Sequence, residues 1–284
     1  MTKPTTPTTT PPPPVPHTLI SFPSPHILLV TLNRPAQLNA IPQPQHFALS
    51  HLWDWFDAEP ALRAAILTGS GRAFCAGADL KEWDTINADA SPPSGEEAKG
   101  GKIPPSGFGG LSNRPGKKPV IAAVNGLCLG GGMEMLLNCD IVVAAPAAQF
   151  ALPEVRIGVI AVAGGLPRLA HSVGRQRAME MALTGKRYGA REMREWGLVN
   201  EVVGEGEVVE AALRWAEMIV RNSPDAVVVS REGVRMAWEG VGAVQATELV
   251  KEGWYKRMEG GENMREGIRS FVERRKPVWR DSKL

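Results

Sequence analysis

Short apolar runs that alternate with helical patterns constrain the fold of this chain more than any other feature of its sequence. Four runs have the length and composition of buried strands, and they lie at residues 26–32, 64–67, 120–124 and 141–144. Between the first two, the spacing i, i+3, i+4, i+7 predicts an amphipathic helix that carries Leu49, Leu52, Trp53 and Phe56. Strands that alternate with helices imply βαβ units with right-handed connections. The sequence therefore predicts an α/β fold.

Changes in local composition divide the chain into four expected parts. Residues 1–16 are rich in Pro and Thr, and because Pro fixes φ and removes backbone donors we expect a disordered tail. Residues 17–205 form the expected core. Within it, residues 84–118 are rich in Pro, Gly, Ser and charge without periodicity, and we expect a flexible loop beside the site. Residues 206–281 are expected to be helical, and the last three residues, 282–284, stand apart as a targeting signal.

The composition is that of a globular protein, with 43% hydrophobic and 22% charged residues. Because 32 Lys and Arg nearly balance 30 Asp and Glu, the net charge of +2 argues against a nucleic-acid partner. No apolar run reaches membrane-spanning length, so we expect no membrane insertion. Cys75, Cys128 and Cys139 form no CxxC pair and lack metal-ligand spacing with His, so we expect free thiols and no metal site.

The chain ends in Ser282-Lys283-Leu284, which is the peroxisomal address. Its position at the free end is where an import receptor reads such a signal. The alternative is a chance ending after a basic stretch. We therefore expect a peroxisomal protein with the import receptor as a partner.

Two segments rich in small residues could bind a ligand through their backbone N–H groups. Residues 72–80, RAFCAGADL, follow a predicted strand and allow the backbone to approach a ligand closely; a plain strand-to-helix turn is the alternative. Residues 126–134, GLCLGGGME, place three consecutive glycines at a helix N-terminus, where unpaired amides can hold an oxyanion. A phosphate loop is the rival, but the GK[ST] signature is absent. Glu134 lies in the first helical turn, where the dipole favours its ionised form and the role of a base.

Glu154 lies in an otherwise apolar stretch, LPEVRIGV. Such surroundings raise the pKa of a carboxyl group and suit it to donate a proton. A helix-capping Glu beside Pro153 is the alternative explanation.

Together these segments resemble the enoyl-CoA hydratase/isomerase family, also called crotonases. The resemblance runs from about Pro25 to Lys276 through LNRPAQLNAI, AFCAGADLKE, AAVNGLCLGGGMEM, CDIVVAAPAAQFALPEVRIGV, AGGLPRL and GIRSFVERRKPVW. It implies a crotonase (ClpP-like) spiral of ββα units, followed by a helical C-terminal trimerisation region. It also implies a homotrimer or a dimer of trimers.

The resemblance assigns roles to individual residues. The N–H groups of Ala78 and Gly131 match the family's oxyanion hole, and Glu134 and Glu154 match the two glutamates that flank one water in hydratases. CoA is part of the substrate, so we expect no separate cofactor. The resemblance places the contacts with CoA at Gln37, Leu38, Ala76, Asp79, Leu80 and Lys81. Phe271 and Lys276 match residues that reach a neighbouring subunit's ligand. Ala161-Val162 stand where hydratases usually have Pro-Gly, so we expect the branched Val162 side chain to narrow the site.

The presence of both glutamates favours an enoyl-CoA hydratase or dehydratase over a delta-isomerase, which commonly keeps only the later one. The Pro/Thr-rich start and the SKL ending resemble the fungal peroxisomal branch of the family. Within it we expect dehydration of mevalonyl-CoA to anhydromevalonyl-CoA in siderophore synthesis. A related branch that makes toxins, β-oxidation of fatty acids, and a non-catalytic scaffold are the alternatives.

Overall fold

The larger of two β-sheets forms the base of the molecule in the computed structural model, which describes residues 8–88 and 103–284. Its strands follow the order β1 (Thr18–Ser21), β2 (Ile27–Leu32), β3 (Ala64–Gly69), β5 (Val120–Val124), β7 (Ile141–Ala144) and β10 (Glu201–Val202). β1 and β2 pair antiparallel, and the other neighbours pair in parallel. All four strands predicted from the apolar runs are confirmed.

The smaller sheet is built from short strands, and its first three directly follow strands of the larger sheet. Its order is β4 (Ala73–Cys75), β6 (Leu127–Leu129), β8 (Gln149–Ala151) and β9 (Tyr188–Gly189). β3 leads to β4, β5 to β6 and β7 to β8, and each pair precedes a helical element: α2 (Leu80–Ala88), α3 (Gly131–Leu136) and the 3₁₀ turn η4 (Glu154–Ile157). This repeated strand–strand–helix order confirms the spiral of ββα units.

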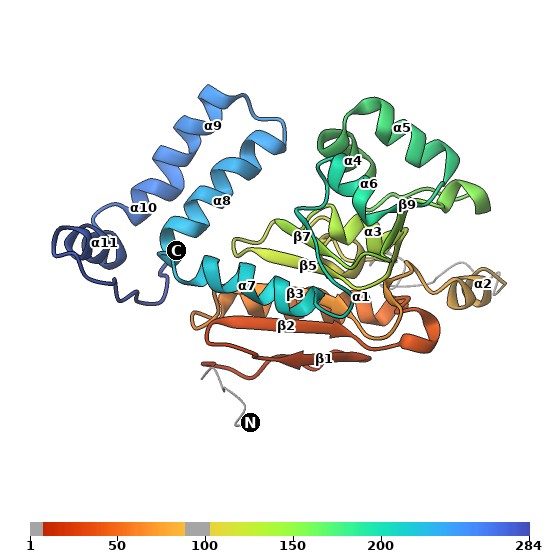
Figure 1. Ribbon diagram of the computed structural model, residues 1–284, viewed down its shortest axis with the longest axis horizontal. Helices are drawn as coiled ribbons and strands as arrows, with labels where there is room; N and C mark the ends of the chain where they lie inside the picture. The colour runs from red at the N-terminus through yellow and green to blue at the C-terminus, as the bar shows by residue number, and fades with distance from the viewer. Residues whose placement is uncertain (1–7, 89–102) are drawn as a thin grey trace, which may run out of the picture.

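The central strands of the larger sheet are buried on both faces. Every residue of β3 and of β5 is buried, and successive side chains of a strand point to opposite sides. Ala64 and Ile66 of β3 pack with α7 (Val208–Val220), which runs along one face in Figure 1. Ala65 and Leu67 belong to the other core. There they join α1 (Gln43–Ala58), whose predicted stripe of Leu49, Leu52, Trp53 and Phe56 is fully buried.

The second half of the chain is helical, as expected. The elements are α4 (Gly165–Val173), α5 (Arg175–Thr184), α6 (Ala190–Glu195), α8 (Pro224–Trp238), α9 (Ala243–Val250), a π-helical turn (Lys251–Tyr255), α10 (Lys256–Met258) and α11 (Glu262–Val272). Ser223 caps α8 by accepting from the Ala226 N–H at 3.4 Å. The region 206–281 has two parts, since α7 covers the sheet while α8 to α11 extend to one side (Figure 1). None of the helices described combines the length and apolarity needed to cross a bilayer.

The expected disorder of residues 1–16 does not extend to Thr9 and the residues after it. The N–H groups of Thr9 and Thr10 donate to Glu59 Oε2 at 2.9 and 3.2 Å, and Trp55 Nε1 donates to Thr10 Oγ1 at 2.8 Å. Val15 is buried in the main core. An extended Pro-rich chain makes no internal hydrogen bonds, so its N–H groups need other acceptors. For Thr9 and Thr10 that acceptor is the buried Glu59 carboxylate. Residues 1–7 lie outside the described chain.

Residues 103–118 also differ from the flexible loop expected over 84–118. They contain a 3₁₀ turn, η3 (Phe108–Gly110), whose backbone is fixed from α1: Trp53 Nε1 donates to the Gly109 carbonyl at 3.1 Å, and the Gly109 N–H donates to His46 Nδ1 at 2.9 Å. Burial lowers the pKa of His46 to about 4, so the ring stays neutral and can accept. Residues 84–88 end α2, and residues 89–102 lie outside the described chain.

The packing of the N-terminal segment predicts that Glu59→Ala loosens it. We expect the Thr9 and Thr10 amides to exchange with solvent about tenfold faster, because each loses a hydrogen bond to a charged acceptor worth about 1.5 kcal/mol or more. Hydrogen exchange followed by mass spectrometry measures this, with the exposed Glu205→Ala as the control. Unchanged exchange in Glu59→Ala would contradict the packing of this segment.

Candidate active site

The residues with predicted chemistry follow three adjacent strands of the smaller sheet. β4, β6 and β8 are parallel neighbours, so their carboxyl ends meet at one edge. β4 leads into residues 76–79, β6 leads into residues 130–134, and β8 leads into Glu154. The structure therefore brings Ala78, Gly131, Glu134 and Glu154 to the same place from three separate segments.

The loop of Ala78 and the loop of Gly131 touch through backbone atoms. A Cβ atom at Gly77, where φ is +99°, would lie 3.2 Å from the Leu129 carbonyl oxygen and 3.3 Å from the Gly131 nitrogen. Within residues 8–88 and 103–284, neither the Ala78 N–H nor the Gly131 N–H donates to an acceptor of the chain. Two neighbouring unused donors can together hold one oxygen atom that develops negative charge.

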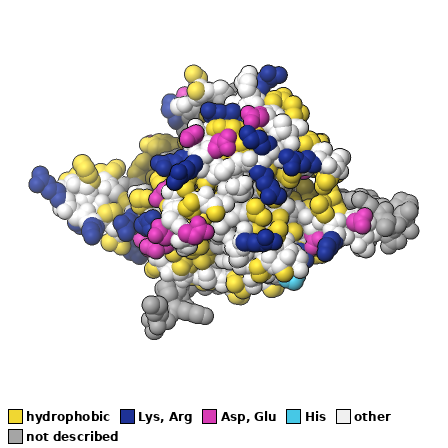
Figure 2. Space-filling model, turned by 45° about the vertical axis from the view of Figure 1, so that its right-hand side comes forward, with side chains coloured by type: hydrophobic (Ala, Val, Ile, Leu, Met, Phe, Trp, Pro, Cys, Tyr) yellow, Lys and Arg dark blue, Asp and Glu magenta, His cyan; other side chains and the backbone are white. Residues whose placement is uncertain are grey.

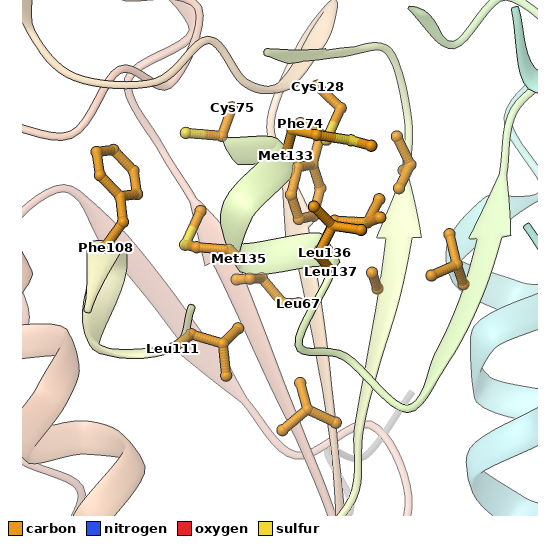
Figure 3. Close-up of a cluster of buried hydrophobic side chains, with 14 of the residues drawn as sticks. Leu67, Phe74, Cys75, Phe108, Leu111, Cys128, Met133, Met135, Leu136 and Leu137 are labelled. Atoms are coloured by element: carbon orange, nitrogen blue, oxygen red, sulfur yellow. The ribbon is translucent and has the colours of Figure 1, made fainter. Parts of the chain in front are cut away.

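The glycines before α3 are required by close packing. A Cβ at Gly131 would lie 2.4 Å from the Phe108 ring, and one at Gly132 would lie 2.3 Å from the Cys75 carbonyl oxygen. Gly130 has a φ of +55°. Figure 3 shows Phe108 beside α3 with Met133 and Met135 on the helix. A side chain at any of these glycines would displace the donor loop.

Glu134 lies in the first turn of α3 and is only 4% exposed. Its Oε1 accepts from the Ala163 N–H at 2.8 Å and the Gly165 N–H at 3.1 Å. Burial raises the pKa of Glu134 to about 7, and the negative charge of Glu154 acts in the same direction, while the two amides and Arg168 oppose it. The position of Glu134 in the first helical turn favours its ionised form, but desolvation is the larger effect and the pKa is raised.

Glu154 opens η4 immediately after Pro153. Its Oε2 is buried and has no hydrogen-bond partner in the part of the chain that the structure describes. Its Oε1 lies 3.0 Å from the place where a Cβ at Gly130 would be, so the carboxyl group faces the glycine loop. Burial raises the pKa of Glu154, as its apolar surroundings predicted.

The segments expected to contact CoA meet at the start of α2. The Ala76 N–H donates to the Leu38 carbonyl at 3.0 Å, and Leu38 has a φ of +53°. Asp79 joins the two segments, because its Oδ2 accepts from Arg34 Nη1 at 2.9 Å and its Oδ1 accepts from the Lys81 N–H at 3.2 Å. Gln37, Leu80 and Lys81 are exposed beside them. The Asp79 carboxylate thus holds the loops together.

Two other expected contacts are not gathered at this site within one chain. Phe271 is 84% exposed on α11, which lies at the opposite end of the molecule from α2 (Figure 1), and the exposed Lys276 follows α11. Val162 is 72% exposed and has a negative φ. Val162 directly precedes Ala163, whose N–H donates to Glu134, so the expectation that its side chain narrows the site stays a prediction.

Sequence reasoning missed the residues that hold Glu134. They come from the motif AGGLPRL, which was recognised without roles for its members. A Cβ at Gly165 would lie 2.7 Å from Glu134 Cγ, so this position excludes a side chain. Arg168 is 8% exposed, donates to the Gly164 carbonyl at 3.2 Å and pairs with Glu239 at 3.1 Å. The available signal was an arginine in an apolar stretch, three residues after two consecutive glycines.

Within the described chain, the cysteines, the potential metal ligands and the surface charges provide no further functional site. Cys75 and Cys128 are buried and free, as expected, whereas Cys139 is partly buried; burial raises the pKa of Cys75 to about 12 and keeps its thiol protonated. Among the described residues, no group of three or more His, Cys, Asp or Glu has a metal-binding arrangement. Figure 2 shows Lys and Arg side chains scattered among acidic and apolar ones on the face that it draws.

The family model described as enoyl-CoA hydratase/isomerase matches residues 24–282. The chain belongs to the enoyl-CoA hydratase/isomerase family. The crystal structure of an enoyl-CoA hydratase from Mycobacterium tuberculosis superposes with a TM-score of 0.81 at 34% identity, covering 94% of this chain and 100% of that one. The predicted crotonase fold is thereby confirmed.

Two relatives are considerably more similar in sequence. A protein of Beauveria bassiana is 61% identical over 277 residues, which is 96% of this chain and 98% of the relative. A protein of Aspergillus fumigatus is 50% identical over 266 residues, or 94% of this chain and 96% of the relative. Both carry the name mevalonyl-coenzyme A hydratase. The mitochondrial enoyl-CoA hydratase of Pongo abelii is 38% identical, covering 89% of this chain and 83% of that protein.

The raised pKa of Glu134 predicts a pH-dependent gain of stability in Glu134→Gln. In the native protein the carboxyl keeps its proton up to a pH of about 7, whereas in the unfolded chain it loses it near 4.5. The native state therefore binds more protons in this window, and the wild type loses stability as the pH rises through it. Since each pKa unit is worth about 1.4 kcal/mol, Glu134→Gln should gain up to about 3 kcal/mol over the wild type between pH 4.5 and 8.

Urea unfolding at several pH values measures this gain. The exposed Glu205→Gln is the matched control, and its difference from the wild type should not vary with pH in this way. A constant difference between Glu134→Gln and the wild type would show that Glu134 is already ionised near pH 5.

Proposed function

We propose that this chain is a hydro-lyase that removes water from, or adds water to, the Cα–Cβ bond of an acyl-CoA thioester. The observation that carries the proposal is the pairing of two buried carboxyl groups, Glu134 and Glu154, with the unused N–H donors of Ala78 and Gly131. The donors suit the thioester oxygen of an enolate. The carboxyl groups suit the transfer of two protons. An acyl-CoA substrate fits the family to which the chain belongs.

In the dehydration direction, Glu154 as carboxylate takes the proton from Cα. The charge moves onto the thioester oxygen, where the N–H groups of Ala78 and Gly131 stabilise the enolate. Glu134 in its protonated form then gives its proton to the hydroxyl group on Cβ. The Cβ–O bond breaks, the Cα=Cβ bond forms and water leaves. The substrate has lost H⁺ and OH⁻ in total, and proton exchange with solvent restores both glutamates.

A pKa of about 7 suits Glu134 to this cycle, because a substantial fraction of the group is protonated near neutral pH. In the hydration direction the ionised fraction accepts a proton from the attacking water. The proposed chemistry uses side chains and backbone of this chain alone, with CoA as part of the substrate and no separate cofactor.

The proposed substrate is mevalonyl-CoA, which loses water to give anhydromevalonyl-CoA. The support is the 61% and 50% identity to two proteins named mevalonyl-coenzyme A hydratase, over almost the full length of each. The expected place in siderophore synthesis follows from the same resemblance. The mitochondrial enoyl-CoA hydratase of Pongo abelii is less similar, at 38% identity.

Mass spectrometry of the purified protein with mevalonyl-CoA, crotonyl-CoA and a 3-enoyl-CoA tests this function. We expect a product lighter by one water from mevalonyl-CoA, and rates that fall about 10²- to 10⁴-fold in Glu134→Gln and in Glu154→Gln. The exposed Glu205→Gln should keep the wild-type rate. A shift of the 3-enoyl double bond at constant mass that survives Glu134→Gln would instead identify a delta-isomerase.

We also propose a homotrimer or a dimer of trimers. Apolar side chains crowd one exposed stretch of the chain, at Val155, Ile157, Ile160 and Val162. Phe271 and Val272 of α11 are exposed as well. A monomer rarely leaves large apolar side chains together in water, and a second copy would cover them. This assembly would also let Phe271 and Lys276 serve a neighbouring site.

Peroxisomal import through the C-terminal tripeptide is the proposed route to the compartment. Ser282 Oγ donates to Asp225 Oδ1 at 2.5 Å and Lys283 Nζ donates to Glu262 at 2.5 Å, yet the three residues keep part of their surface exposed. We expect a fluorescent fusion at the N-terminus to collect in peroxisomes and to become diffuse when residues 282–284 are deleted. The host must lack the native protein, because unmodified subunits can carry a variant in. Peroxisomal signal from the deleted variant would overturn this proposal.

A further inference from the structure

The Glu134 carboxylate is held where an irregular turn passes into α4. Of the two N–H groups that donate to its Oε1, one comes from Ala163 in this turn and the other from Gly165, the first residue of α4. The turn precedes α4 and contains Gly164, whose φ is +100°. The position of the carboxylate therefore depends on whatever fixes residues 163–165.

A buried hydroxyl group fixes the turn through the Ala163 carbonyl oxygen. Ser112 is 0% exposed, and its Oγ donates to the Ala163 carbonyl oxygen at 2.8 Å. Ser112 Oγ in turn accepts from the Phe108 N–H at 2.7 Å. A chain of hydrogen bonds thus runs from Phe108 through Ser112 and Ala163 to Glu134, and the Phe108 ring at its start packs on Gly131.

Arg168 supports the same turn and leads back to the neighbour of Ser112. It donates through Nη1 to the Gly164 carbonyl at 3.2 Å and through Nη2 to Asn113 Oδ1 at 3.1 Å. Two consecutive residues, Ser112 and Asn113, therefore hold the turn, one directly and one through the arginine. Arg168 also acts on Glu134 through its charge, whereas the neutral Ser112 hydroxyl acts on it through position.

We propose that Ser112 is a positioning residue for Glu134, whose hydroxyl group keeps the Ala163 and Gly165 N–H groups aimed at the catalytic carboxylate. This proposal rests on the proposed hydro-lyase function. Ser112 precedes Glu134 by 22 residues in the sequence and belongs to none of the groups assigned to the reaction. Its role is to set where Glu134 stands relative to Cβ of the substrate. A displacement of about 1 Å at a reacting group can lower a rate about 10²-fold.

Ser112→Ala leaves the buried Ala163 carbonyl and the Phe108 N–H without their shared partner, and the turn relaxes. We expect kcat for dehydration to fall about 10- to 100-fold. KM for the CoA thioester should stay within about twofold, since the CoA-binding segments lie elsewhere. Weaker donation from the two amides also raises the pKa of Glu134, so the basic limb of the pH–kcat profile should move to higher pH.

Ser50→Ala is the matched control. Ser50 Oγ bonds Ser106 Oγ at 2.7 Å, so this variant removes a hydroxyl from the support of the same loop without touching residues 163–165. It should keep both kcat and the pH profile of the wild type. Ser112→Cys, which keeps a weaker donor at the same place, should give an intermediate kcat and serves as the test if Ser112→Ala does not fold.

A double-mutant cycle separates positioning from general loosening. In the Glu134→Gln background, Ser112→Ala should lower kcat no further, because the group that it positions is already disabled. Full activity of Glu134→Gln would defeat the proposed function itself. A normal kcat and pH profile in Ser112→Ala and Ser112→Cys, or a drop of equal size in both backgrounds, would overturn the positioning role while leaving the function intact.

Discussion

The backbone of Gly77 lies against the backbone of Leu129 to Gly131, and the site is organised around that contact. It requires that β4 and β6 pair in parallel, with Cys75 beside Cys128, so that both loops leave the sheet at the same edge. It also requires the absence of side chains, because a Cβ at Gly77, Gly131 or Gly132 would enter space that other atoms occupy. Two N–H donors become neighbours only as a result of this packing.

The acidity of Glu134 follows from a competition among several physical effects at one carboxyl group. Burial and the nearby Glu154 favour the protonated form, whereas two amides and Arg168 favour the ionised form. Their balance places the pKa near the pH at which the group is useful as both acid and base. Glu154 reaches a raised pKa more simply, since burial dominates and one of its oxygens lacks a partner within the described residues.

Much of the fold could be predicted from local sequence, because a short continuous apolar run is typical of a strand whose two sides are both buried. The four strands and the α1 stripe carry such local signals. The packing of residues 8–16 and 103–118 could not be predicted in this way, because a Pro- and Gly-rich composition predicts flexibility. These segments are fixed by hydrogen bonds to Glu59 and His46, which are distant in the sequence. The same limit applied to the site. Glu134 and Glu154 could be found from motifs, but the pKa of Glu134 depends on burial and on a turn about thirty residues later.

The proposed oxyanion donors are main-chain groups, and this has a consequence for how the sequence can change over evolutionary time. No single codon change deletes an amide N–H, short of one that introduces proline, whereas one base change can replace either glutamate. Substitutions therefore rarely remove the capacity to stabilise an enolate, but they can readily change the side chains that decide which reaction the enolate undergoes. A lineage built on this backbone can exchange water chemistry for another reaction without first losing its hold on the thioester.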